Sequence, residues 1–221
     1  MLDELLRHRE IVFLDEVDQP GGPEPHAIRQ RCHAAFAAAV DERVRFVGTV
    51  EPRKNLLTLV RAFEQILRQT SHRPQLVVAG AAGWLMDELF AVVKQSPVSD
   101  RLLLTGYLDD EDLRALYSSC RVFVYPSIYE GFGFPPLEAM ACGAPVIASN
   151  IATFQETLGS AAHLVDPNDV DAIARSIVEI LEDEGRRRAL SRRGLEHAGK
   201  FSWERTAQMT LDVYRKVLGE S

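Results

Sequence analysis

The sequence has 221 residues, of which 46% are hydrophobic and 26% are charged, as expected for a globular protein that can bury a core. The formal net charge of −7 argues against nucleic acid as the main partner, because binding a phosphate backbone needs a positive field. Any phosphate site must therefore be local. The first residues, Met1 to Leu14, match neither a signal peptide nor a membrane span, so we expect a cytoplasmic protein.

Residues 1–42 differ in character from the rest of the chain. A short apolar run at Ile11–Leu14 predicts a strand, and the Pro- and Gly-rich segment Gln19–Pro23 predicts a turn or linker. A helix is expected from about Pro25 to Val40. We therefore divide the chain into an atypical N-terminal extension or linker, residues 1–42, and one larger domain, residues 43–221.

From Val44 onward, short β-branched runs alternate with amphipathic stretches, the pattern of strand–helix–strand units around a parallel sheet. We predict an α/β fold with a Rossmann-like open sheet of six parallel strands and helices on both faces. An Arg-rich helix from Gly185 to Gly199 and an amphipathic helix from Trp203 to Leu218 end the chain. The predicted strands are Val44–Val47, Gln75–Ala79, Arg101–Leu104, Val122–Tyr125, Val146–Ala148 and Ala162–Val165.

Three stretches carry apolar residues at helical spacing and predict core-facing helices. They are Leu56, Leu59, Val60, Phe63 and Leu67; Leu113, Leu116, Tyr117 and Cys120; and Ile173, Ile177, Ile180 and Leu181.

A turn with two adjacent cations follows the first predicted strand. Between Gly48 and Asn55 it carries Arg53 and Lys54, and a helix follows. In open parallel sheets, ligands bind beyond the carboxyl ends of the strands, where this turn, Gly106-Tyr107 and the segment 127–134 are all expected. Arg53, through its planar fork, and Lys54, as a mobile charge, can neutralise a diphosphate. The alternative is a pair of surface cations.

The segment Tyr129–Met140 places two carboxylates, Glu130 and Glu138, around a glycine loop that opens a helix. Pro135 and Pro136 suit a first helical turn, where a missing N–H costs nothing. Backbone amides at a helix start can bind a diphosphate, and Glu138, one turn further, can accept hydrogen bonds from a vicinal diol such as ribose. Glu130 would point toward the group attached to the phosphates. The alternative is an ordinary strand-to-helix turn with a solvated acid at each end.

Two common nucleotide-binding motifs are missing. The sequence lacks Gly-x-Gly-x-x-Gly after its first strand and any Gly-x-x-x-x-Gly-Lys-Ser/Thr, which argues against a dinucleotide oxidoreductase and a P-loop NTPase. We also find no Asp-x-Asp metal motif near the expected site, so we expect neither a metal nor a separate cofactor.

Four motifs together resemble the donor-binding, C-terminal half of a retaining GT-B glycosyltransferase of the glycosyltransferase family 4 (group 1) type. They are Val47–Asn55, Tyr125-Pro126-Ser127, the pair Glu130 and Glu138, and Phe201-Ser202-Trp203. The resemblance runs from about Val44 to Leu218. It implies transfer of a hexose from a nucleotide-diphosphate sugar with retention of configuration, in which the donor phosphate itself takes the acceptor proton.

The resemblance also implies roles for individual residues. Lys54, with Arg53 nearby, would bind the diphosphate, Glu138 would hold the ribose, and Glu130 would orient the donor sugar as the catalytic-site residue. The loop around Tyr107 would line the base, unless Tyr107 only packs. The complete expected donor-binding set is Gly48, Arg53, Lys54, Tyr107, Gly131, Phe132, Gly133, Phe134, Leu137 and Glu138.

The sequence departs from the family pattern in two ways. Thr49 stands where many members carry Arg, so the phosphate charge falls on Arg53 and Lys54. Residues 1–42 are too short for the N-terminal Rossmann domain of a complete GT-B enzyme, so we expect another domain or a separate chain to complete the cleft. The final helix resembles the segment that crosses back to that domain, and we expect its apolar face to be exposed or paired.

The expected donor is GDP-mannose first and a UDP-sugar second, and the expected acceptor is a glycan or a lipid-linked glycan in polysaccharide or glycoconjugate assembly. A partner could hold the protein at the inner face of the membrane. Two alternatives stay open: a non-catalytic nucleotide-sugar-binding module or subunit, and a GT-B protein that catalyses phosphorolysis or epimerisation.

Overall fold

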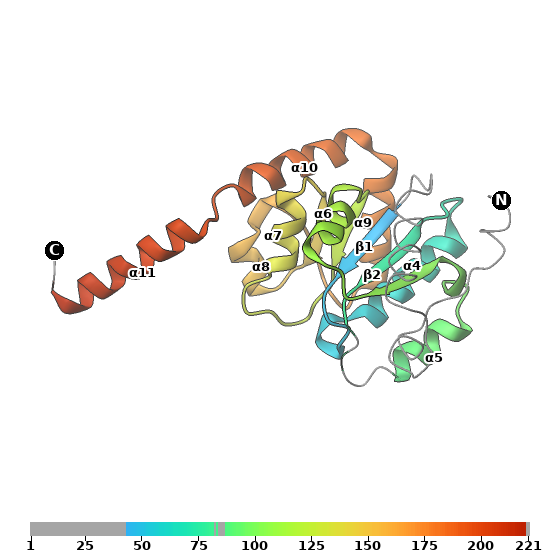
Figure 1. Cartoon of the computed structure of the whole chain (residues 1–221). Coiled ribbons are helices and arrows are strands. Elements are labelled where there is room, and N and C mark those ends of the chain that lie inside the picture. Colours follow the sequence, from blue (N-terminus) through green and yellow to red (C-terminus); the bar gives the residue numbers. More distant parts are fainter. Residues whose placement is uncertain (1–42, 82, 84–86, 220–221) are drawn as a thin grey trace.

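The computed structural model of the protein describes residues 43–81, 83 and 87–219 (Figure 1). The elements expected in residues 1–42 lie outside this part. Six parallel strands form one sheet in the order β3-β2-β1-β4-β5-β6, so the α/β, Rossmann-like prediction is confirmed. The strands are β1 Arg43–Val47, β2 Gln75–Ala79, β3 Leu102–Gly106, β4 Val122–Tyr125, β5 Val146–Ser149 and β6 His163–Val165.

The predicted strand bounds need small corrections. Strand β3 begins at Leu102, because Arg101 ends the short 3-10 helix η2, Ser99–Arg101. It continues to Gly106, whose carbonyl accepts a hydrogen bond of 2.8 Å from the Gly80 amide just beyond β2. At the other edge, β6 begins at His163 because Ala162 still closes the short 3-10 helix η3, Gly159–Ala161.

Helices cover both faces of the sheet. Helix α4 packs against α5 and α9, whereas α6 packs against α7, and α10 contacts both α7 and α9 (Figure 1). The α-helices of the described part are α4 Leu56–Gln69, α5 Asp87–Gln95, α6 Asp110–Ser118, α7 Phe134–Ala141, α8 Ala152–Thr157, α9 Val170–Glu182, α10 Glu184–Ala198 and α11 Trp203–Leu218. The Arg-rich helix α10 starts one residue earlier than predicted, because the Asp183 carboxylate caps it by accepting from the Arg186 amide.

The predicted apolar stripes form much of the core. Leu59, Val60 and Phe63 of α4 are fully buried, as are Ile173 and Ile177 of α9, and the two stripes meet on the same face of the sheet. The predicted stripe on α6 extends past the helix end, because Cys120 lies just beyond Ser118 and still packs, partly buried, against the core. Burial of these side chains, at about 25 cal/mol per Å² of apolar area, is the main force that holds the helices on the sheet.

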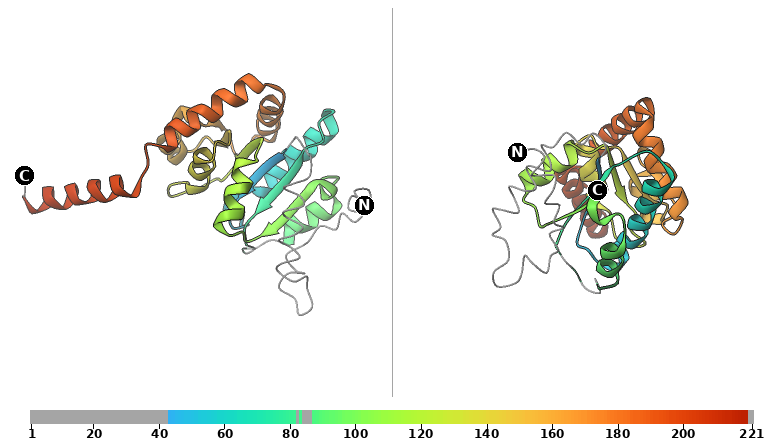
Figure 2. Two further views of the ribbon diagram at one scale, coloured as in Figure 1. Left: turned by 45° about the horizontal axis from the view of Figure 1, so that its top comes forward. Right: turned by 90° about the vertical axis from the view of Figure 1, so that its right-hand side faces the viewer.

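Helix α11 extends away from the rest of the protein (Figure 2). The Ser202 hydroxyl caps its start by accepting from the Arg205 amide, and Gly219 ends it in a left-handed conformation with φ 73°. All of its residues are exposed, including the apolar residues Met209, Val213, Tyr214 and Val217. In this chain, the predicted apolar face is therefore exposed.

Candidate functional site

The strand order creates a crevice at the carboxyl edge of the sheet. The chain runs from β1 outward to β2 and β3, then returns to place β4 on the other side of β1. At this change of direction the segments that follow β1 and β4 leave toward opposite faces, which is where open α/β sheets bind ligands. The turn after β1 and the loop after β4 therefore lie side by side.

Asn55 fastens this turn to two other loops. Its backbone is left-handed, with φ 57°, a conformation that Asn tolerates better than most residues. Its side-chain amide donates to the Pro126 carbonyl at 3.1 Å and to the Pro167 carbonyl at 2.7 Å, while its Oδ1 accepts from Thr58 at 2.6 Å. The loops after β1, β4 and β6 are thus held together. No role was predicted for Asn55 from the sequence, although Asn at a helix start is a signal for such a turn.

The predicted residues Lys54 and Glu130 form the centre of a buried ion-pair network, which we define as Glu51, Arg53, Lys54, Ser127 and Glu130. Lys54 Nζ lies 2.7 Å from Glu130 Oε1, and the Ser127 hydroxyl donates to the same oxygen at 2.7 Å. Lys54 also donates a hydrogen bond to the Tyr125 hydroxyl, with its Nζ 4.9 Å from that ring's centre. The Lys54 and Glu130 side chains are only 7% and 9% exposed.

Arg53 completes the ion-pair network from its exposed side. Its Nε lies 2.5 Å from Glu51 Oε1, and its Nη1 lies 3.1 Å from Glu130 Oε2. The two predicted phosphate-binding cations are therefore paired with two carboxylates, and the four formal charges cancel. Because Arg53 is 41% exposed and Lys54 is buried, Arg53 is the cation that a ligand reaches more easily.

The network shifts the pKa of Glu130 and that of the neighbouring Tyr125. Burial raises the pKa of Glu130, but hydrogen bonds from Lys54 and Ser127, with the charges of Lys54 and Arg53, outweigh burial and leave the pKa below its ordinary value. Burial, followed by the charge of Glu130, raises the pKa of Tyr125. Glu130 is thus ionised and Tyr125 protonated near neutral pH.

Helix α7 begins beside this network, as the sequence predicted. Gly133 precedes it with φ 95°, and a Cβ at this position would lie 2.4 Å from the buried Phe154 ring, so only glycine fits without a shift. The helix has no side-chain cap. Because Pro135 and Pro136 lack amide hydrogens, its first turn offers the amides of Phe134 and Leu137, fewer donors than an ordinary helix start.

Glu138 lies one turn into α7 with an exposed side chain. Its Oε2 accepts a 3.0 Å hydrogen bond from the hydroxyl of Tyr117 on α6. The Cα–Cβ bond of a helical residue tilts toward the helix N-terminus, so Glu138 leaves α7 in the direction of its first turn. The sequence predicts Tyr117 only as a core residue, and its ring is buried in the core.

The remaining predicted residues surround this centre. Gly48 follows β1 with φ 150° and donates through its amide to the Ala79 carbonyl at 2.8 Å. Gly131 is exposed, and a Cβ there would meet no atom within 4 Å. Tyr107, just after β3, is 80% exposed, so its ring faces solvent rather than the core.

A cluster of exposed aromatic rings links the glycine loop to the start of α11. Phe132 contacts Phe134 at 5.0 Å and Phe201 at 6.0 Å between ring centres, and Phe134 stacks on Trp203 at 6.4 Å. Phe201 and Trp203 belong to a motif that is visible in the sequence, but their contact with the glycine loop is not.

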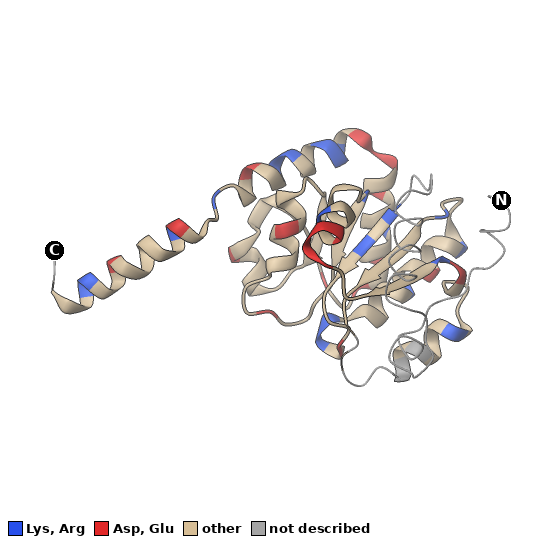
Figure 3. Cartoon of the chain, viewed as in Figure 1, with Lys and Arg blue, Asp and Glu red and all other residues tan. Residues whose placement is uncertain are grey.

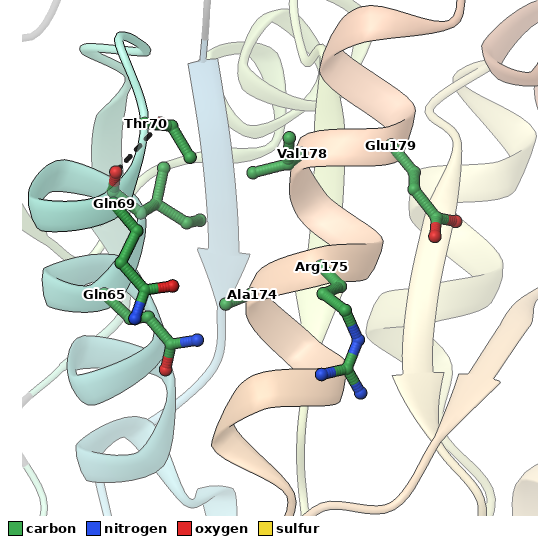
Figure 4. A pocket seen from close by; sticks show the side chains of 8 residues that line it. Gln65, Gln69, Thr70, Ala174, Arg175, Val178 and Glu179 are labelled. Carbon is green, nitrogen blue, oxygen red and sulfur yellow. Dashed lines mark hydrogen bonds between the residues drawn. The ribbon is translucent and has the colours of Figure 1, made fainter.

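Two hollows lie on the described part of the protein. One, of about 370 Å³, lies between the loops after β4, β5 and β6 and is lined by Ile128, Asn150, Ile151, Asp166, Pro167 and Asn168. The other, of about 200 Å³, is a groove between α4 and α9 lined by Gln65, Ile66, Gln69, Thr70, Ala174, Arg175, Val178 and Glu179 (Figure 4). The hollow of about 370 Å³ adjoins the carboxyl edge of the sheet. The groove does not, because it lies beside the C-terminal end of α4, whereas α4 begins near the carboxyl end of β1.

Acidic side chains gather at the first turn of α6, whereas α10 carries much of the basic charge (Figure 3). Asp110-Glu111-Asp112 is an Asp-x-Asp sequence, yet no group of three or more His, Cys, Asp or Glu among the described residues is placed to hold a metal ion. Within the same residues, no helix combines the length and apolar character needed to cross a membrane.

The profile of a protein family described as glycosyl transferases group 1 matches residues 36–197 of this chain. The chain belongs to this family. Over 170 residues this glycosyltransferase domain is 43% identical to the O-antigen chain mannosyltransferase B of Escherichia coli, covering 77% of this chain and 45% of that protein. The chain spans less than half the length of the curated relatives it matches.

Solved structures share the fold. Sucrose-phosphate synthase from Thermosynechococcus elongatus superposes with a TM-score of 0.74 and 33% identity, over 87% of this chain and 49% of that one. The HepE protein of Anabaena, solved with UDP and glucose, also gives a TM-score of 0.74, over 88% of this chain and 53% of that one. Its 21% identity is a likeness of fold alone. Membership of the group 1 glycosyltransferases and the GT-B-type fold of the domain are therefore confirmed.

Proposed function

We propose that this group 1 glycosyltransferase domain binds a nucleotide-sugar donor at the carboxyl edge of its sheet and forms the donor half of a GT-B enzyme. In this proposal the whole enzyme transfers a hexose with retention of configuration. The proposal rests on one arrangement. Helix α7 begins without a side-chain cap at the point where the strand order reverses, and an exposed carboxylate, Glu138, lies one turn along the same helix.

The spacing along α7 fits a nucleoside diphosphate. A diphosphate at the helix start meets the amides of Phe134 and Leu137, the glycine-loop backbone and the positive end of the helix dipole. Glu138 lies four residues after Phe134, about 6 Å along the helix axis, so it suits the ribose that follows the phosphates. Tyr107, exposed at the end of β3, then contacts the base.

The ion-pair network supplies the remaining phosphate contacts. Arg53, the more exposed cation, binds the diphosphate directly. Lys54 is buried and attracts the diphosphate through its charge, without direct contact. Glu130 holds both cations and orients the loop that faces the donor sugar, together with the Gly131–Phe134 backbone. Because the network is neutral without a ligand, diphosphate binding depends on backbone dipoles as well as on cations.

In the proposed reaction, the bond between the sugar C1 and the diphosphate oxygen breaks. The acceptor hydroxyl oxygen bonds to C1 on the same face, and its proton passes to the departing phosphate. The protein contributes positioning and charge stabilisation, and no side chain attacks the sugar.

GDP-mannose is the first proposed donor because the relative with 43% identity is named a mannosyltransferase. A UDP-sugar is the second, since the HepE structure holds UDP and glucose. The proposed acceptor is a glycan or lipid-linked glycan. A further domain, on the same polypeptide or a separate chain, supplies the opposite wall of the cleft, and such a partner could hold the enzyme at the inner membrane face.

Calorimetric titration of the 221-residue chain with GDP, UDP and ADP tests this function. We expect GDP or UDP to bind with a dissociation constant below about 1 mM. This limit is on the order of the upper KM values that are common for enzyme substrates. No binding by any of them at millimolar concentration would refute the proposal. Sugar-transfer assays with and without the completing domain then separate an enzyme from a binding module that lacks catalysis.

A further inference from the structure

Tyr117 is a core residue whose hydroxyl contacts an exposed side chain. The residue is 2% exposed, and its ring packs edge-on against Phe123 with ring centres 5.4 Å apart. Its hydroxyl reaches the neighbouring helix α7, where it donates to Glu138 Oε2 at 3.0 Å. A rigid ring held on α6 therefore fixes one oxygen of an exposed carboxylate on α7.

This contact matters because a glutamate side chain is otherwise flexible. An exposed glutamate populates several rotamers, and a ligand that needs one of them must bear the cost of ordering the side chain. The Tyr117 hydrogen bond removes part of that cost before the ligand arrives. An ionised carboxylate has about four acceptor positions, so one bond to Oε2 leaves capacity for both hydroxyls of a vicinal diol.

We propose that Tyr117 is a positioning residue that holds Glu138 in the orientation needed to recognise the 2′- and 3′-hydroxyls of the donor's ribose. This inference rests on the proposed function, because it assigns Tyr117 to the same ribose contact. Tyr117 itself does not touch the donor.

The protonation of Tyr117 suits this role. Burial, followed by the charge of Glu138 and the hydrogen bond to it, raises the pKa of Tyr117 well above its ordinary value. The hydroxyl therefore stays a donor wherever Glu138 is ionised. A phenylalanine keeps the packing on Phe123 and removes only the donor, so Tyr117→Phe isolates the positioning effect.

The test compares ribose with deoxyribose in the 221-residue chain. Calorimetry measures the dissociation constants of GDP and UDP and of their 2′-deoxy and 3′-deoxy forms. We expect the parent protein to prefer the ribose form by about tenfold, the worth of one hydrogen bond to a charged group. In Tyr117→Phe this preference falls by about three- to tenfold, while the deoxy nucleotides bind within twofold of the parent.

Two further variants make the result specific. Tyr214→Phe removes the same hydroxyl from the exposed helix α11, and we expect no change in any of these affinities. Glu138→Gln abolishes the ribose preference, and adding Tyr117→Phe to it changes nothing further, because the two residues act on one contact.

The outcomes separate the inference from the proposed function. If the parent binds no nucleotide at millimolar concentration, the proposed function and this inference both fail. If the parent binds with a ribose preference that Tyr117→Phe leaves intact, the inference alone fails. Equal weakening of ribose and deoxyribose nucleotides would also overturn it, because that result indicates a structural role.

Discussion

The loop that carries Glu130 and the helix that carries Glu138 differ sharply, although the two glutamates lie eight positions apart. Glu130 is buried, and its carboxylate is occupied by contacts with Lys54, Arg53 and Ser127. Glu138 is exposed and bonded to Tyr117 through one oxygen. One acid therefore builds the site, and the other remains available to a ligand.

Topology explains the difference. Strand β1 and strand β4 are neighbours, so the loop after β4 meets the cationic turn after β1 and encloses Glu130. Glu138 lies on the outward side of α7, while Leu137 and Met140 turn toward the core. Substitutions at the two acids and in the loop between them test this contrast.

The largest effect is expected from removing the cation beside Glu130. Lys54→Met leaves a carboxylate in the interior with only Arg53 and Ser127 as partners, so we expect the free energy of unfolding to fall by about 3 kcal/mol. Denaturant unfolding measures the loss. The double variant Lys54→Met/Glu130→Gln should recover at least half of it, because the unpaired charge is gone. A loss below about 1 kcal/mol in the single variant would show that the pair is not buried in solution.

The backbone between the two acids gives the second test. Gly133→Ala forces a side chain into a left-handed conformation and against Phe154, so we expect a loss of about 2 kcal/mol. Gly131→Ala is the matched control, since a Cβ there meets open space, and its effect should stay within about 0.5 kcal/mol. Thermal unfolding of both variants checks the prediction. Equal losses would mean that the turn before α7 differs from the one described.

The third prediction concerns pH. The pKa of Glu130 is lower in the folded protein than in the unfolded chain. Ionised Glu130 therefore stabilises the fold at pH values above its pKa in the unfolded chain, and this stabilisation is lost as the pH falls through its pKa in the folded protein. Glu130→Gln removes this dependence. We expect the parent to be more stable than the variant by about 1 kcal/mol at pH 7 and the difference to shrink below about pH 4.5. Urea unfolding across this range measures it, and a difference that grows in acid would contradict the assignment.

The smallest effect on stability is expected at Glu138. Its side chain is exposed, so Glu138→Gln should change the free energy of unfolding by less than about 0.5 kcal/mol. The same change should weaken nucleotide binding by about tenfold. Unfolding and calorimetry on one preparation compare the two effects. A stable variant with unchanged nucleotide affinity would remove Glu138 from the proposed site.

Much of the fold follows from local sequence patterns. The apolar runs located all six strands to within two residues, because a parallel strand buried on both faces must be apolar along its length. Gly133, Pro135 and Pro136 likewise indicated the start of α7 through their own backbone preferences. The convergence of the turn after β1 and the loop after β4 followed from the general placement of loops in parallel sheets.

The side-chain partners could not be predicted in the same way. Lys54 and Glu130 are 76 residues apart in the sequence, and both are common surface residues, so no local pattern indicates that they pair. Tyr117 belongs to an apolar stripe, and only the packing of α6 on α7 brings its hydroxyl to Glu138. The pairing of Arg53 and Lys54 with Glu51 and Glu130 likewise arises only when the loops after β1 and β4 come together.

In the proposed function, a nucleoside diphosphate binds at the start of α7 beside the ion-pair network. Backbone amide chemical shifts of the 221-residue chain, followed during titration with GDP and UDP, test it most directly. We expect the largest shifts on residues 131–134, Leu137 and Gly48. Shifts confined to the groove between α4 and α9, at Gln65, Gln69 and Thr70, would contradict it.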